Sequence, residues 1–165
     1  MQIHNLTYRV WHNPVYFTAF GFGAGLAPVA PGTFGTLAAI PLYLLIVWFL
    51  SPLSYVIILL LAFLCGVWIC DKVSSEMGVG DYGGIVFDEI VGYLLTMWAV
   101  PLGLPWLIGG FLLFRLFDIW KPFPISWVDK HIKGGLGIML DDVLAAIPAC
   151  LILHGIAYSI IRTTT

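Results

Sequence analysis

Long apolar runs dominate this sequence, and the breaks between them predict its helices. Residues 10–70 contain no Asp, Glu, Lys or Arg. Within this stretch, residues 37–50 and 54–70 are apolar runs separated by Ser-Pro-Leu, which is typical of two helices joined by a tight turn. A bilayer core is about 30 Å thick and takes about 20 helical residues, so the first helix would have to include residues 32–36 or tilt little. The pattern predicts a hairpin of two membrane helices.

The next uncharged run, residues 90–114, has two interpretations. As one straight helix it would place Glu89 and Arg115 on opposite sides of a membrane, whereas as a hairpin it would bring them together. A Pro-Leu-Gly-Leu-Pro pattern at residues 101–105 removes a helical hydrogen bond and favours a turn, so we expect the hairpin. Each arm is then short unless it extends into the flanking charged sequence. Charged side chains at membrane depth are costly and are therefore functional candidates.

Residues 143–161 form a last apolar run, interrupted only by Pro148, His154 and Gly155, and they predict a fifth span. The expected fold is an all-α, polytopic membrane helical bundle of about five short spans, arranged as hairpins plus a C-terminal span. Residues 1–165 are expected to form a single integral membrane domain. With five spans, six of the seven Lys and Arg residues fall on one side, which the positive-inside rule makes the cytoplasmic side.

Composition supports a membrane protein and excludes other classes. Apolar residues make up 61% of the 165 positions and charged residues only 10%, against roughly a quarter in soluble domains. The formal net charge of −2 provides no basic field, so we expect no nucleic-acid partner. The three cysteines lie in or beside apolar runs without C-x-x-C spacing. We expect buried packing thiols at Cys65, Cys70 and Cys150, not a disulfide or a zinc site.

The charges are few but concentrated, because 14 of the 16 (seven Lys or Arg plus nine Asp or Glu) lie between residues 71 and 142. Folding the apolar runs into hairpins brings four polar segments to one rim of the bundle. The first segment, residues 21–35, is rich in glycine. Its glycines either form a small-residue packing face, or Gly32 and Thr33 open a helix whose backbone N–H groups bind a phosphate. Spacing alone leaves both interpretations open.

Two adjacent carboxylates, Asp88 and Glu89, stand at the mouth of the apolar helix that follows them. Neighbouring residues on a helix diverge by about 100°, so the two acids are expected to take different roles. One would bind a metal ion while the other forms hydrogen bonds or handles a proton. Alternatively, both are helix N-terminal acids stabilised by the macrodipole. That alternative explains one acid more easily than two.

Arg115, Asp118 and Lys121 recur at intervals of three along an otherwise apolar helix end and form a rough stripe on one face. Two cations around one acid suit an anionic oxygen ligand and a hard cation. The alternative is a self-neutralising interfacial ion pair with a snorkelling lysine. Asp129 and Lys130 are expected to be solvated.

The fourth segment runs from Lys133 through three glycines to Asp141 and Asp142. We expect a closely folded loop, with the paired aspartates capping the last span. Capping would account for one of the two aspartates. Binding of a divalent metal ion would account for the second acid at the same membrane edge. Carboxylates with no cysteine and few histidines favour Mg²⁺, which prefers octahedral oxygen ligands.

Together these four segments resemble the phosphatidylglycerophosphatase A family of bacterial membrane enzymes. The resemblance extends from about residue 13 to residue 157 and rests on residues 21–37, 86–92, 115–125 and 133–142. It implies Mg²⁺-dependent removal of the terminal phosphate from phosphatidylglycerophosphate, giving phosphatidylglycerol and phosphate. It also implies a place in the bacterial cytoplasmic (inner) membrane, with the active site facing the cytoplasm. Thr36 departs from the serine expected in a Gly-Ser-Leu motif but keeps the hydroxyl group.

The nucleophiles of other phosphatases are missing from the sequence, which has no Cys followed by five residues and Arg, no Asp-x-Asp-x-Thr or Val, and no Ser-Gly-His. Attack by a metal-activated water is then the simplest mechanism. Carboxylates would hold one or two Mg²⁺ ions, and cations would neutralise the phosphoryl oxygens. Asp88 or Glu89 would act as the base. The expected metal ligands are Asp88, Glu89, Asp141 and Asp142; the expected catalytic residues are Asp88, Glu89, Arg115, Asp118 and Lys121; the expected substrate-binding residues are Gly32, Thr33, Arg115, Lys121 and Lys133.

Two other function classes would also account for part of the sequence. A small ion- or proton-coupled membrane transporter is the main alternative, because intramembrane acids also mark ion paths. Its weakness is that residues 37–50 and 54–70 contain no acid or base to relay a proton. A non-catalytic membrane scaffold leaves the clustered carboxylates unexplained. The expected partners are the phospholipid substrate and the lipid bilayer, and the sequence leaves the oligomeric state open.

Overall fold

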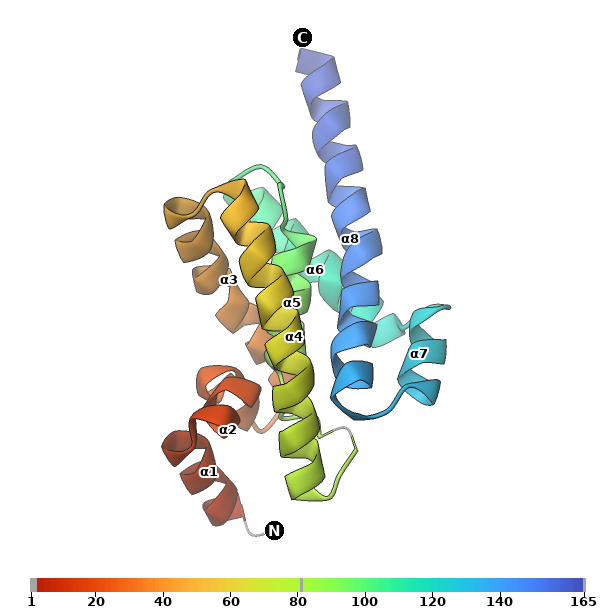
Figure 1. Cartoon of the computed structure of the whole chain (residues 1–165). Coiled ribbons are helices and arrows are strands. Elements are labelled where there is room, and N and C mark those ends of the chain that lie inside the picture. Colours follow the sequence, from red (N-terminus) through yellow and green to blue (C-terminus); the bar gives the residue numbers. More distant parts are fainter. Residues whose placement is uncertain (1–2, 81, 165) are drawn as a thin grey trace.

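The computed structural model describes residues 3–80 and 82–164, and every regular element within them is a helix (Figure 1). The predicted all-α fold is confirmed. In chain order the elements are α1 (Ile3–His12), α2 (Pro14–Ala19), the 3-10 helix η1 (Gly21–Leu26), α3 (Pro31–Phe49), α4 (Pro52–Met77), α5 (Phe87–Thr96), α6 (Leu104–Trp120), α7 (Ile125–His131) and α8 (Gly134–Thr164).

Helices α3 and α4 form the first predicted hairpin. Ser51 begins α4, because its Oγ accepts a hydrogen bond from the backbone N–H three residues later at 3.2 Å. Helix α4 continues past residue 70 and ends at Gly78, which has a left-handed φ of +69°. The charged residues 71–76 therefore belong to the last turns of α4, at the same end of the bundle as α1 and α2 (Figure 1).

Helices α5 and α6 form the second hairpin, so the interpretation of residues 90–114 as two arms is confirmed. Residues 97–103 connect the arms, which have ten and 17 residues. The Tyr93 hydroxyl donates a hydrogen bond of 3.2 Å to the Leu107 carbonyl and joins the arms. The beginning of α5 and the end of α6 consequently lie at the same end of the bundle.

Helix α8 begins much earlier than expected. Residues 134–142, predicted as a folded loop, form its first turns, so Asp141 and Asp142 lie inside the helix and do not cap it. Gly135 lets α8 approach the backbone of α4 so closely that a Cβ there would overlap a carbonyl oxygen. The Asp71 carboxylate of α4 accepts a hydrogen bond from the Gly135 N–H at 3.0 Å and fixes the beginning of α8.

Among the described residues, three helices are long and apolar enough to cross a membrane: α3, α4 and α8. The expected count of five spans is not confirmed. Helix α5 is about 15 Å long at 1.5 Å per residue, half the thickness of a bilayer core. It lies within the bundle, packed against α3, α4, α6 and α8, and eight of its ten residues are buried. Helix α5 therefore lies in the interior of the bundle, whereas α6 has an exposed face that includes Leu112 and Leu116.

The buried core has two parts. One fills the space among α3, α5, α6 and α8, with Tyr43, Tyr93 and Phe114 as its largest side chains. The other packs α1 and α2 against the charged end of α4 and the beginnings of α5 and α8. In this second part the Tyr16 hydroxyl donates a hydrogen bond of 3.0 Å to Glu76 Oε2, which ties α2 to α4.

The three cysteines are free thiols, as expected, but they are not all buried. Cys70 is buried and Cys150 is half-buried, whereas Cys65 is exposed. The prediction of a buried thiol is wrong for Cys65, because it lies on the outward face of α4 that also exposes Leu61 and Leu64.

Candidate active site

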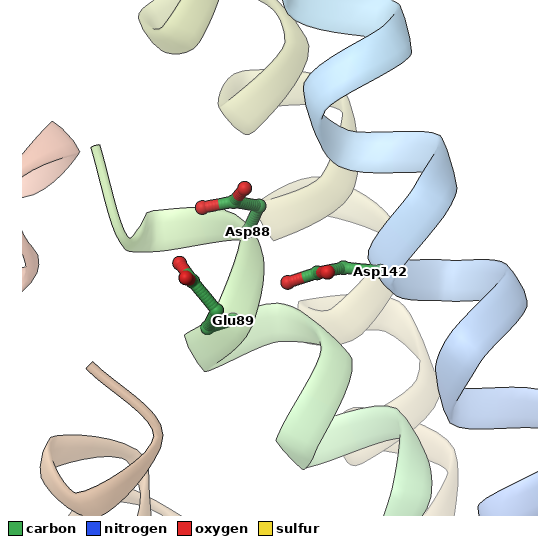
Figure 2. Close-up of side chains that lie close together, drawn as sticks. All are labelled: Asp88, Glu89 and Asp142. Carbon is green, nitrogen blue, oxygen red and sulfur yellow. The ribbon is translucent and has the colours of Figure 1, made fainter. Parts of the chain in front are cut away.

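Three carboxylates from two helices converge at the charged end of the bundle (Figure 2). Asp88 and Glu89 come from the first turn of α5, and Asp142 comes from α8. One oxygen atom of each side chain lies within 4.8 Å of those of the other two. We call these three side chains the carboxylate cluster.

Gly92 allows α5 and α8 to come close enough for this convergence. A Cβ on Gly92 would lie 2.6 Å from the Phe114 ring and 3.3 Å from the Cβ of Asp142. Asp88 and Glu89 also stand at the positive end of the α5 dipole, which favours negative charge. The dipole does not account for Asp142, because that residue lies well inside α8.

The carboxylate cluster is largely withdrawn from solvent. Asp142 is 2% exposed and Asp88 is 9% exposed. Within the described part of the chain, Glu89 Oε2 and Asp142 Oδ2 are buried without a hydrogen-bond partner. Buried carboxylates without a compensating charge destabilise a fold. A cation bound among them would relieve that cost.

The donor set fits Mg²⁺. All three side chains offer hard oxygen ligands, and neither a cysteine nor a histidine from the described residues belongs to the group. Opposite oxygen ligands of an octahedral Mg²⁺ ion are roughly 4 Å apart. The separations of up to 4.8 Å in the cluster are only slightly wider.

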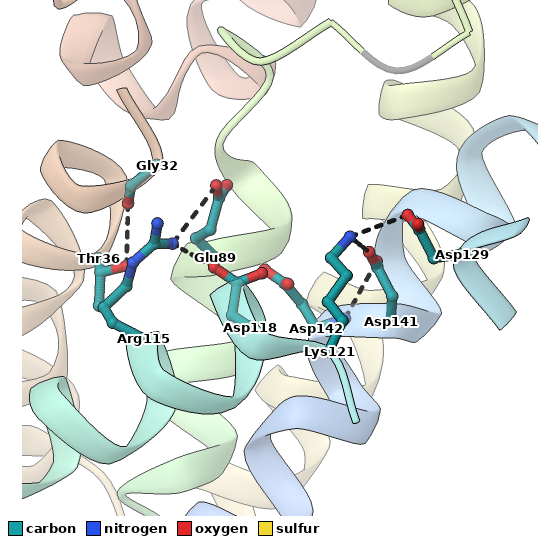
Figure 3. A network of polar contacts seen from close by, with 9 residues as sticks. All are labelled: Gly32, Thr36, Glu89, Arg115, Asp118, Lys121, Asp129, Asp141 and Asp142. Carbon is teal, nitrogen blue, oxygen red and sulfur yellow. Dashed lines mark hydrogen bonds and ion pairs between the residues drawn. The ribbon is translucent and has the colours of Figure 1, made fainter. Parts of the chain in front are cut away.

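Arg115 of α6 faces the carboxylate cluster from the side of α3 (Figure 3). Its Nη1 lies 3.8 Å from Glu89 Oε1 and donates a hydrogen bond to Asp118 Oδ2. Its Nε is buried and has no hydrogen-bond partner among the described residues. The Asp118 carboxylate lies beside that of Asp142 (Figure 3). A buried guanidinium with an available donor beside the cluster can bind a phosphoryl oxygen.

The beginning of α3 lies against Glu89 and Arg115. A Cβ on Gly32 would collide with Glu89 Oε1 and lie 3.1 Å from Arg115 Nη1. The structure thus brings Gly32 to the site. It does not leave the Thr33 N–H available for a phosphate, because this group donates a hydrogen bond of 2.9 Å to the Ala30 carbonyl. The Thr33 N–H is therefore an engaged donor, and phosphate binding at Gly32 and Thr33 stays a prediction.

Lys121 follows α6 in a left-handed conformation and binds two acids (Figure 3). Its Nζ donates hydrogen bonds to Asp129 Oδ1 at 2.8 Å and to Asp141 Oδ2 at 2.6 Å. Burial alone would lower the pKa of the Lys121 ammonium, but the two carboxylates outweigh burial and raise it. Lys121 therefore stays protonated and links α6, α7 and α8. Asp129 is partly exposed, as expected, but its carboxylate also binds Lys121.

Asp141 and Lys133 lie apart from the carboxylate cluster. Consecutive residues of a helix diverge by about 100°, so the Asp141 carboxylate meets Lys121 while that of Asp142 joins the cluster (Figure 3). Lys133 is exposed, and its Nζ donates a hydrogen bond of 3.0 Å to the Asp129 carbonyl. Of the four predicted metal ligands, the structure brings Asp88, Glu89 and Asp142 together but not Asp141. Lys133, predicted to bind substrate, also lies outside the cluster.

Comparison with known proteins identifies the family. The chain matches the family described as phosphatidylglycerophosphatase A over residues 17–157. The chain belongs to this family. A phosphatidylglycerophosphatase A of Escherichia coli (strain K12) is 43% identical over 147 residues, covering 88% of this chain and 85% of the relative. The phosphatidylglycerophosphatase A of Haemophilus influenzae is 45% identical over 147 residues, covering 88% and 90%.

Membership of the phosphatidylglycerophosphatase A family makes this chain a phosphatase, so the transporter and scaffold alternatives lose their support. The resemblance noted from four sequence segments is confirmed. A further relative, from Bacteroides thetaiotaomicron, is 38% identical over 135 residues, covering 77% of this chain and 83% of its own length. It carries the provisional name of a phosphatidylinositol-3-phosphatase. No solved structure matches the chain.

The sequence did not indicate the contacts of two acids at this end of the phosphatidylglycerophosphatase A chain. Asp129 accepts a hydrogen bond from Lys121, and its only signal was its position shortly after a Pro-Phe-Pro turn. Asp71 fixes the beginning of α8. As a single acid at the end of an apolar run, Asp71 gave no indication of its partner 64 residues later.

Proposed function

We propose that this protein hydrolyses the terminal phosphate of phosphatidylglycerophosphate in a Mg²⁺-dependent reaction that yields phosphatidylglycerol and phosphate. The observation that carries the proposal is the buried cluster of Asp88, Glu89 and Asp142, with Arg115 beside it. Two relatives that are more than 40% identical bear the name of this activity.

Asp88, Glu89 and Asp142 would hold the Mg²⁺ ion. Their oxygen chemistry, their spacing and the unpartnered oxygens of Glu89 and Asp142 support this assignment. When bound, Mg²⁺ neutralises phosphoryl oxygens and makes water a better nucleophile at neutral pH.

The side chains around the carboxylate cluster supply the other functions of the reaction. Arg115 binds the oxygens of the terminal phosphate, and Asp118 holds the guanidinium in place through its hydrogen bond. Asp88 or Glu89 accepts a proton from the attacking water. The water oxygen forms a bond to phosphorus, the bond from phosphorus to the glycerol oxygen breaks, and that oxygen takes up the proton that the carboxyl group received from water.

The reaction would take place at the cytoplasmic face of a bacterial inner membrane. The beginnings of α5 and α8 and the end of α6 lie at one end of the bundle, whereas Arg162 lies near the far end of α8 (Figure 1). The positive-inside rule assigns the more basic end to the cytoplasm. There the terminal phosphate can reach the site while the acyl chains of the substrate stay in the leaflet.

Phosphate release from the purified protein tests the proposal. The protein in phospholipid nanodiscs is supplied with phosphatidylglycerophosphate or with phosphatidylinositol 3-phosphate, in Mg²⁺ or in EDTA. We expect release from phosphatidylglycerophosphate in Mg²⁺ and none in EDTA. Equal release in EDTA contradicts the role of Mg²⁺, and release from the inositol lipid alone contradicts the assigned substrate.

A further inference from the structure

Helix α4 carries none of the three acids of the carboxylate cluster, yet α5 and α8, which carry them, both pack against it. Gly66 of α4 faces Met139 of α8, which lies three residues before Asp142. A Cβ on Gly66 would lie 2.6 Å from Met139 Sδ and 2.7 Å from Met139 Cε. Met139 is fully buried, and its Sδ also contacts Cys70 Sγ at 3.9 Å. Its side chain therefore cannot move out to solvent to make room.

The same glycine also faces α5. A Cβ on Gly66 would lie 3.1 Å from Phe87 Cδ1, closer than ordinary van der Waals contact, and Phe87 directly precedes Asp88. Phe87 is 9% exposed and belongs, with Met139, to the core that packs against α4. The segments that lead to Asp88 and to Asp142 thus rest on α4 at one glycine.

A second contact fixes α8 against α4 one turn earlier in α8. A Cβ on Gly135 would overlap the Val67 carbonyl oxygen, a backbone atom that no side-chain rotation can move. The Gly135 N–H donates its hydrogen bond to the Asp71 carboxylate, which fixes the position of α8 along α4. We call these contacts, made by Gly66, Val67 and Asp71 of α4 with Gly135 and Met139 of α8, the α4–α8 seam.

The separation of Asp88 and Asp142 decides how well the carboxylate cluster suits a small cation. Mg²⁺ demands near-ideal octahedral geometry with oxygen ligands at about 2.0–2.1 Å. Ca²⁺ accepts about six to eight oxygen ligands at about 2.3–2.6 Å in flexible geometry. A displacement of either acid from the arrangement that holds Mg²⁺ therefore weakens Mg²⁺ binding more than Ca²⁺ binding, whichever way the acid moves.

We propose that α4 sets the cation preference of the carboxylate cluster, with Gly66 as a positioning residue that acts through Met139 and Phe87. This inference rests on the proposed function, because it requires a divalent cation at the cluster. Gly66 contacts neither the cation nor the substrate. It lets α5 and α8 approach α4 closely, and the α4–α8 seam then holds Asp88 and Asp142 at the separation that Mg²⁺ needs.

A volume exchange at Gly66 tests the proposal. Gly66→Ala adds a methyl group at the seam, and the double variant Gly66→Ala/Met139→Ala returns the space. The single variant Met139→Ala completes the double-mutant cycle. Gly155→Ala is the matched control, because it makes the same change in a helix where a Cβ meets no atom within 4 Å.

The readout is the Tm of the purified protein in detergent, without substrate, as a function of Mg²⁺ or Ca²⁺ concentration. Each titration gives the concentration that produces half of the maximal rise in Tm. We expect the ratio of this concentration for Mg²⁺ to that for Ca²⁺ to rise roughly tenfold in Gly66→Ala. The ratio is expected to return close to the wild-type value in the double variant and to stay unchanged in Gly155→Ala.

Asp71 provides a second test that does not depend on packing at Gly66. Asp71→Ala removes the acceptor of the Gly135 N–H, whereas Asp71→Asn keeps a side-chain oxygen in its place. We expect the ratio of Mg²⁺ to Ca²⁺ concentrations to rise roughly tenfold in Asp71→Ala and to stay near the wild-type value in Asp71→Asn. If Gly66→Ala does not fold, this pair decides the question.

The outcomes separate a positioning role from a structural one. A lower Tm in EDTA with an unchanged ratio of Mg²⁺ to Ca²⁺ concentrations, in Gly66→Ala or in Asp71→Ala, means that the seam only stabilises the fold and overturns the proposal. A double variant that keeps the altered ratio of Gly66→Ala also overturns it. In these cases phosphate release by the wild type in Mg²⁺ still upholds the proposed function. A wild-type Tm that responds to neither cation contradicts the Mg²⁺ site of the proposed function, and this inference with it.

Discussion

Gly32 at the beginning of α3 lies so close to Glu89 in α5 that a Cβ on residue 32 would collide with Glu89 Oε1. Thr36 supports this turn of α3, because its Oγ1 donates a hydrogen bond of 2.9 Å to the Gly32 carbonyl (Figure 3). Threonine in place of the expected serine therefore retains a structural contact. Because Glu89 belongs to the carboxylate cluster, the position of its side chain depends on a glycine at residue 32.

The first prediction concerns Gly32→Ala. The added methyl group displaces the Glu89 carboxylate, so we expect activity to fall about 10–100-fold and half-maximal activity to require more Mg²⁺. Phosphate release as a function of Mg²⁺ concentration checks this. The matched control is Gly155→Ala in α8, where a Cβ meets no atom within 4 Å. A wild-type Mg²⁺ response in Gly32→Ala contradicts the prediction.

The second prediction separates activity from stability at Asp142. Asp142→Asn removes a buried charge that faces other acids, so the free energy of unfolding in EDTA is expected to rise by about 1–3 kcal/mol. Phosphate release is expected to fall at least about a thousandfold, since a ligand and its charge are lost. Thermal unfolding in detergent and a phosphate assay measure the two effects.

A glutamate pair provides the control for charge removal. Glu89→Gln changes the carboxylate cluster, whereas Glu76→Gln makes the same chemical change at the exposed end of α4 and keeps an oxygen that can accept from Tyr16. We expect Glu89→Gln to behave like Asp142→Asn and Glu76→Gln to behave like the wild type. Similar activity losses in both glutamate variants would show that the effect is not specific to the cluster.

The two hairpins of this fold could be predicted because Ser51 and Pro52 interrupt the apolar run at the first turn, and two prolines and a glycine interrupt it at residues 101–105. The beginning of α8 could not be predicted, because its three glycines read as a loop. Gly135 serves a different purpose, since it lets α8 approach the backbone of α4. Tertiary packing here outweighs the low helix propensity of glycine. The number of membrane spans could not be predicted either, because α5 is apolar like a membrane helix but lies inside the bundle.

The sequence predicts which residues form the candidate site better than it predicts which of them contact each other. Asp88, Glu89 and Asp142 do meet, but adjacent Asp141 is directed to Lys121. Sequence alone gives equal weight to two neighbouring aspartates, and only the rotation of α8 against α5 and α6 decides which one joins the cluster. The partner of Lys121 in α7, Asp129, depends on the turn at residues 122–124, whose direction the sequence pattern does not specify.

The third prediction is that Mg²⁺ stabilises the wild-type fold. A ligand that binds only the folded state raises the free energy of unfolding by about 2.7 kcal/mol at 100 times its dissociation constant. We therefore expect the Tm in detergent to rise with Mg²⁺ and the rise to be lost in Asp142→Asn. Choline chloride at matched ionic strength is the control for screening. An equal rise in the variant contradicts a site at the carboxylate cluster.

The fourth prediction concerns the ion pairs of Lys121. Lys121→Gln leaves the Asp141 carboxylate, which is largely buried, without its cation, so we expect a loss of about 1–3 kcal/mol in the free energy of unfolding. Asp129→Asn is expected to cost less, about 1 kcal/mol or below, because the Asp129 side chain is 35% exposed and better screened. Thermal or denaturant unfolding of both variants and of the double variant measures the coupling between the two residues.

The pH dependence of this difference tests whether Lys121 acts through its charge. Its pKa is raised in the folded state, so its contribution to stability is fully present below the unfolded pKa of about 10.4 and is lost as the pH rises through the folded pKa. The stability difference between wild type and Lys121→Gln is therefore expected to be constant from about pH 8 to about pH 10 and to shrink above that range. Lys121→Arg, which keeps a cation at all these pH values, is the control. A difference that stays constant well above about pH 10 would mean that packing of the lysine chain, and not its charge, stabilises this end of the bundle.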